Sequence, residues 1–110
     1  MNHDLDLKSQ VKQILKVVRE VAPGRSVELR IPPFAAIQCV GGGTHRRGTP
    51  PNVVEMSAET LLNLLDNPVK WQQYCDLGSI SASGTNSNLG SLFAEVSKLV
   101  NSDVRNKNGK

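Results

Sequence analysis

The sequence has few aromatic residues, few cysteines and no long hydrophobic run, and each scarcity excludes a class of protein. One Trp, one Tyr and two Phe are too few for a platform on which nucleic-acid bases stack. Cys39 and Cys75 lie far apart without a second thiol near either, which argues against a metal site and a disulfide framework. We therefore predict two buried, reduced thiols, no metal and no cofactor. No apolar stretch approaches the roughly 20 residues of a membrane-spanning helix.

The length and the charge distribution predict one domain followed by a polar tail. A chain of 110 residues can bury one modest core. Of the net charge of +3, a surplus of two positive charges lies in residues 101–110, which we expect to be disordered. The domain is then residues 1–100, with too little basic surface for a nucleic-acid partner. The acidic, polar start of the chain is unlike a secretory signal, so we predict a cytoplasmic protein.

Hydrophobic periodicity predicts an α+β fold. Residues 7–21 carry apolar side chains at helical spacing, whereas Val27, Leu29 and Ile31 alternate with the polar Glu28 and Arg30 as in a half-buried strand. Further strands are predicted over residues 34–40, 52–56 and 79–83, and further helices over residues 57–66, around residues 69–74 and over residues 89–100. The strand side chains that point away from the apolar stripes are polar, so we expect helices to cover one face of the sheet only.

Several runs of the sequence resemble a known family. Residues 22–28 (APGRSVE), 32–39 (PPFAAIQC) and 47–55 (RGTPPNVVE) resemble the bacterial sterol-carrier-protein orthologues, and residues 53–60 and 71–84 resemble the wider sterol-carrier-protein type 2 fold. The resemblance covers about residues 8–100, and the chain departs from the family beyond Leu92. It implies a mixed sheet of four or five strands, covered by helices on one face, and an apolar pocket for a sterol-like or acyl lipid.

The candidate residues for such a pocket are the apolar side chains of the later helices: Leu65, Trp71, Leu89, Leu92, Phe93 and Val96. Their spacing alone favours an ordinary packed core, whereas the resemblance implies that they line a cavity. Two hypotheses therefore stay open. The first is a non-catalytic module that carries a hydrophobic small molecule, and the alternative is a protein–protein interaction domain with a filled core.

The segment from Gly41 to Gly48 combines glycines with His45, Arg46 and Arg47. Exposed amides and cationic side chains of this kind can hold a carboxylate or phosphate, for instance a lipid head group. The alternatives are a solvated loop or an ion pair with Glu55. A phosphate-binding P-loop is excluded because no Gly-Lys-Ser/Thr follows.

No pair of residues makes a convincing catalytic site. Cys39 and His45 form the one conceivable nucleophile–base pair, and a core thiol beside a loop imidazole is the favoured interpretation. We therefore expect a protein that is not an enzyme and has no catalytic residue.

Overall fold

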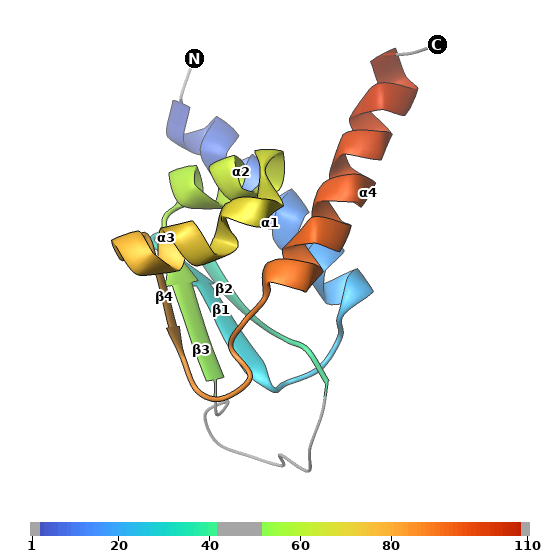
Figure 1. Ribbon diagram of the computed structural model, residues 1–110. Helices are drawn as coiled ribbons and strands as arrows, with labels where there is room; N and C mark the ends of the chain where they lie inside the picture. The colour runs from blue at the N-terminus through green and yellow to red at the C-terminus, as the bar shows by residue number, and fades with distance from the viewer. Residues whose placement is uncertain (1–2, 42–51, 109–110) are drawn as a thin grey trace.

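The computed structural model describes residues 3–41 and 52–108, with the side chains of residues 6–41 and 52–101. Helices and strands follow one another in the order expected from the sequence (Figure 1). The elements are α1 (His3–Val21), β1 (Val27–Ile31), β2 (Ala35–Cys39), β3 (Asn52–Met56), α2 (Ala58–Asp66), the short 3₁₀ helix η1 (Pro68–Lys70), α3 (Trp71–Leu77), β4 (Ile80–Ser83) and α4 (Gly90–Asn108).

The four strands form a mixed sheet in the order β2-β1-β3-β4. β1 is antiparallel to β2 and parallel to β3, and β4 is antiparallel to β3. The parallel pair places Arg30 opposite Glu55, and the Nη1 of Arg30 lies 3.8 Å from the Oε1 of Glu55. The fold class expected from the sequence, an α+β fold with a mixed sheet of four or five strands, is therefore confirmed.

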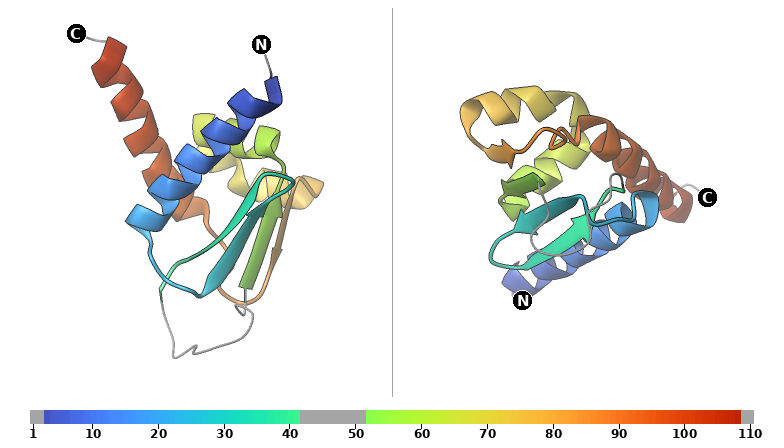
Figure 2. Two further views of the ribbon diagram at one scale, coloured as in Figure 1. Left: turned by 180° about the vertical axis from the view of Figure 1, so that it is seen from behind. Right: turned by 90° about the horizontal axis from the view of Figure 1, so that it is seen from below.

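Helices cover one face of this sheet, as the strand pattern predicted. Val27, Leu29 and Ile31 have no exposed surface, whereas Arg30 is exposed and Glu28 is half-buried on the opposite face. Seen from behind, the strands lie in front of α2 and α3 (Figure 2). Because a shift of one residue would exchange the two faces, this burial pattern confirms the predicted orientation of β1.

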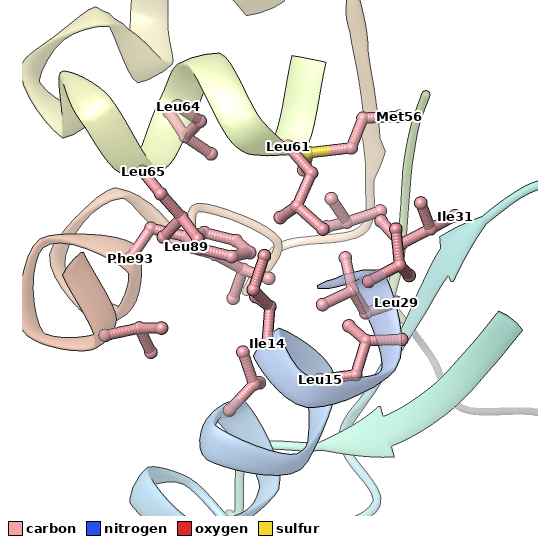
Figure 3. Close-up of a cluster of buried hydrophobic side chains, with 14 of the residues drawn as sticks. Ile14, Leu15, Leu29, Ile31, Met56, Leu61, Leu64, Leu65, Leu89 and Phe93 are labelled. Atoms are coloured by element: carbon pink, nitrogen blue, oxygen red, sulfur yellow. The ribbon is translucent and has the colours of Figure 1, made fainter. Parts of the chain in front are cut away.

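The core fills the space between the sheet and the helices. Figure 3 shows side chains from α1, β1, α2 and α4 pointing into one cluster. Its largest fully buried members are Phe93, Leu29, Ile31, Leu61 and Leu64. α1, α2 and α4 contribute through the apolar stripes that the sequence predicted, whereas α3 contributes Trp71. Val69, which the sequence placed in the same apolar segment, is exposed.

Local sequence signals explain where the middle helices begin and end. The backbone N–H of Thr60 donates to the Oγ of Ser57 at 3.1 Å, which caps the first turn of α2. Asn67 ends that helix directly before Pro68. α3 ends at Gly78, whose φ of 83° lies in the left-handed region that glycine adopts without strain.

The last helix is longer than its apolar stripe. The sequence predicted a disordered tail from residue 101 because apolar residues become scarce there. The structure instead continues α4 to Asn108, and this end of the helix projects from the body (Figure 1). Hydrogen bonds within a helix are local, so its backbone can continue where no core remains to be covered. Over the described residues, no helix is long and apolar enough to cross a bilayer.

Candidate ligand-binding groove

A groove of about 670 Å³ lies where α1, α2 and α4 meet. It is lined by Ser9, Gln10, Gln13 and Ile14 of α1, by Leu62, Leu65 and Asp66 of α2, and by Val100 and Asn101 of α4. Ile14 and Leu65 are buried, and Leu62 and Val100 are half-buried, so the groove offers apolar surface that the fold leaves partly uncovered. Its remaining side chains are polar. The groove thus combines an apolar surface of four side chains with five polar side chains, and a ligand with an apolar part and a polar group can use both.

A buried hydrogen bond sets the spacing of α2 and α4 beside the groove. The last carbonyls of a helix lack partners within the helix, and Leu65 belongs to the last turn of α2. The Oγ of Ser97 donates to the backbone oxygen of Leu65 at 2.6 Å. The Nδ2 of Asn101 in turn donates to the Oγ of Ser97 at 3.2 Å. The first bond holds α4 against α2, and the second fixes the side chain of Asn101 within α4.

Of the six apolar residues predicted from the sequence, Leu65 lines the groove. Trp71, Leu89, Phe93 and Val96 are buried in the core, and half-buried Leu92 packs against it. The rings of Trp71 and Phe93 are stacked, with centroids 6.2 Å apart and 22° between their planes. Leu65, Leu89 and Phe93 lie close together in Figure 3. That all six residues contact a ligand stays a prediction.

The sequence did not reveal the groove residues of α1, nor Leu62, Asp66, Val100 and Asn101. Amphipathic patterning shows which face of each helix is buried, but the groove is formed by the flanks of three helices. Which flanks meet depends on the packing angles of the helices. The half-buried Leu62 and Val100 were the only available signal, because both lie at the edges of apolar stripes.

The predicted anion-binding residues His45, Arg46 and Arg47 lie outside the described residues. Hydrogen bonds and close backbone packing fix the described residues on either side of that loop. The N–H of Ser26 donates to the oxygen of Val40 at 2.9 Å, and the Nδ2 of buried Asn52 donates to the oxygen of Ser26 at 2.9 Å. Gly24 approaches Val40 so closely that a Cβ atom at residue 24 would lie 2.2 Å from the Val40 oxygen.

These contacts of Gly24, Ser26, Val40 and Asn52 lie at the end of the sheet away from the groove. In Figure 1 the start of β3 is at the lower end of the sheet, whereas α2 and the projecting end of α4 are at the upper end. The described residues on either side of the predicted anion-binding loop lie at that lower end. The groove and the described residues that flank the loop are therefore separate features of the fold.

The two cysteines are unpaired. Cys39 is fully buried, and burial raises the pKa of its thiol from 9.0 to about 11. Half-buried Cys75 has a raised pKa too, chiefly through burial and then through the nearby charge of Asp76. The described residues contain no group of three His, Cys, Asp or Glu side chains that could hold a metal ion.

A helical layer on one face of a four-stranded mixed sheet, with a groove between three helices, defines the α+β fold of this chain. Its sequence matches the family described as "Bacterial SCP ortholog" over residues 4–94, and the chain belongs to that family. A solved structure described as "UbiJ-SCP2 Ubiquinone synthesis protein" is similar at 13% identity and a TM-score of 0.47, over 87% of this chain and 95% of that chain. No curated protein matches the chain. The family match ends before Val100 and Asn101, which form the α4 wall of the groove.

Proposed function

We propose that this protein is a non-catalytic binding module that holds a sterol-like or acyl lipid in the groove between α1, α2 and α4. The observation that carries the proposal is the apolar groove of about 670 Å³, within the roughly 300–1,000 Å³ typical of small-molecule sites. Burying about 200 Å² of apolar ligand surface there contributes about 5 kcal/mol before the costs of association. Membership of the SCP family supports a lipid as the ligand.

Because the core is filled, the groove is a more favourable position for a ligand than the interior between the sheet and α4. Phe93 and Val96 have no exposed surface, and Phe93 is stacked on Trp71. A ligand between the sheet and α4 has to separate these side chains and lose their contacts. A ligand in the groove covers Leu62 and Val100, which the fold leaves half-exposed, and displaces only water.

The protonation of the Cys39 thiol, the candidate nucleophile from the sequence, supports a protein that binds without catalysis. A cysteine is nucleophilic as the thiolate, and burial raises the pKa of Cys39 to about 11, so the thiol stays protonated at neutral pH. Two unpaired cysteines also support a reducing compartment such as the cytoplasm as the site of action.

The test is binding of 1-dodecanol, an uncharged amphiphile, measured by calorimetry on the whole chain and on two α4 variants. Val100→Gln puts a polar side chain into the groove, whereas Leu99→Gln alters the adjacent residue, which is 48% exposed and does not line it. We expect Val100→Gln to weaken binding about tenfold, since one buried aliphatic side chain contributes about 1.5 kcal/mol. Leu99→Gln should leave the affinity unchanged.

The alternative, a protein–protein interaction domain, is favoured by the filled core and by exposed Val69 and Leu77 on η1 and α3. If 1-dodecanol does not bind, the lipid proposal is wrong and this alternative takes its place. If it binds both variants equally, the groove is not the site where the lipid binds.

A further inference from the structure

The described lining of the groove carries negative charge and no positive charge. Among the nine residues of the described structure that line it, Asp66 carries the only charged side chain, and none is basic. Asp66 is also the last residue of α2, a helix with no basic residue in its last turn. The C-terminal end of a helix carries a partial negative charge from its aligned peptide dipoles. The carboxylate and the helix end therefore add to each other, and the potential in this part of the groove is negative.

The hydrogen-bond acceptors of the groove, like its negative potential, favour a cationic ligand that donates hydrogen bonds. Asn101 uses an amide hydrogen on the Oγ of Ser97, so the Oδ1 of the same side chain is presented as an acceptor. Among the side chains that the structure describes, no donor is paired with this oxygen or with the carboxylate of Asp66. Both groups can accept a hydrogen bond from a ligand, and the carboxylate repels an anion.

We infer that the groove selects an amphiphile with a cationic, hydrogen-bond-donating head group, a long-chain amine, over the carboxylate with the same chain. This inference rests on the proposed function, because it assigns the head group of the ligand whose apolar part the groove holds. The apolar part lies against Ile14, Leu62 and Val100, and the ammonium group donates to Asp66 and Asn101.

The preference is specific to the groove, because the rest of the chain favours the opposite sign. The chain carries a net charge of +3, so non-specific attraction favours a carboxylate. The predicted anion-binding residues Arg46 and Arg47 belong to the loop between Gly41 and Asn52, whose described flanks lie at the other end of the sheet (Figure 1). Among the described residues, the negative charge of Asp66 in the groove is therefore the source to which we assign a preference for the amine.

The experiment compares dodecylamine with dodecanoate at neutral pH, below the concentrations at which either forms micelles. Calorimetry is done on the unmodified chain, on Asp66→Asn and on Glu95→Gln. Asp66→Asn keeps the size of the side chain and removes its charge. Glu95→Gln removes an equivalent exposed charge from α4 outside the groove and is the matched control. Circular dichroism verifies that both variants keep the fold.

We expect the unmodified chain to bind dodecylamine about fivefold more tightly than dodecanoate, the size of effect that a partly exposed charge pair gives. Asp66→Asn should reduce that ratio to below about twofold, and Glu95→Gln should leave it unchanged. Equal or tighter binding of dodecanoate overturns the inference, as does an unchanged ratio in Asp66→Asn or an equal reduction in Glu95→Gln. Each of these results leaves the lipid proposal standing if 1-dodecanol binds and Val100→Gln weakens that binding.

Discussion

Replacing Phe93 with alanine tests whether the space between α4 and the sheet is filled. Phe93 is fully buried and its ring stacks on Trp71 at 6.2 Å. Removing a buried phenylalanine side chain costs about 3 to 5 kcal/mol, through lost transfer energy and the cavity that remains. We expect a loss of about 4 kcal/mol for Phe93→Ala, a large part of the roughly 5–15 kcal/mol that stabilises a domain. The melting temperature should fall by about 15 °C.

The measurement is urea unfolding followed by the fluorescence of Trp71, the single tryptophan of the chain. Because the substitution alters the surroundings of that ring, circular dichroism serves as a second, independent probe. Leu99→Ala is the control on the same helix. Leu99 is 48% exposed, so its loss should cost less than about 1 kcal/mol.

The result that refutes this reasoning is a loss below about 1.5 kcal/mol for Phe93→Ala with an unchanged dependence on urea. So small a cost means that little packing is lost, so that an open cavity already lies beside Phe93. The internal site implied by the family resemblance, lined by Leu89, Phe93 and Val96, then replaces the groove as the place where a ligand binds.

Three further predictions concern the tail, the loop and a thiol. Deleting residues 102–110 should change the free energy of unfolding by less than about 0.5 kcal/mol, and a loss above about 1.5 kcal/mol means that the tail docks. The double variant Arg46→Ala, Arg47→Ala should weaken binding of inorganic phosphate at least about tenfold and leave binding of 1-dodecanol in the groove unchanged in a binding titration; equal loss of both indicates a folding defect. Burial raises the pKa of Cys39 from 9.0 to about 11, so between these pH values the unfolded chain releases the thiol proton and the folded chain keeps it. The unfolding free energy should therefore fall by about 3 kcal/mol as the pH rises through that range, and the fall should be clearly smaller in Cys39→Ala in urea titrations.

The sequence predicted the sheet well because strand patterning is local. Val27, Leu29 and Ile31 alternate with charged residues, and that alternation determines which face the helices cover. The same reasoning fails at the edge of the sheet. Ala82 lies opposite Val54 and shares its face, yet Ala82 is exposed, because β4 is an edge strand that the helices do not fully cover.

Polar residues at buried positions were not predictable from patterning. Asn52 follows two prolines in sequence and is typical of a turn, but the structure buries it. Its Nδ2 donates to the oxygen of Ser26, and its Oδ1 accepts from the N–H of Asn86, so it joins three segments. Ser97 is another case, since its partner is a backbone oxygen of another helix. Such residues show their role only when distant segments are brought together.

Two walls of the groove lie inside the family match, and the third lies outside it. Residues 4–94 match the family, and they include the α1 and α2 walls. The third wall is formed by Val100 and Asn101, and Ser97 ties it to Leu65. All three α4 residues lie beyond the match. A fold can carry different sites on one framework, so the apolar site can be shared while head-group preference differs. In this chain the proposed preference for an amine depends on Asp66 from the matched part and on Asn101 from the unmatched part.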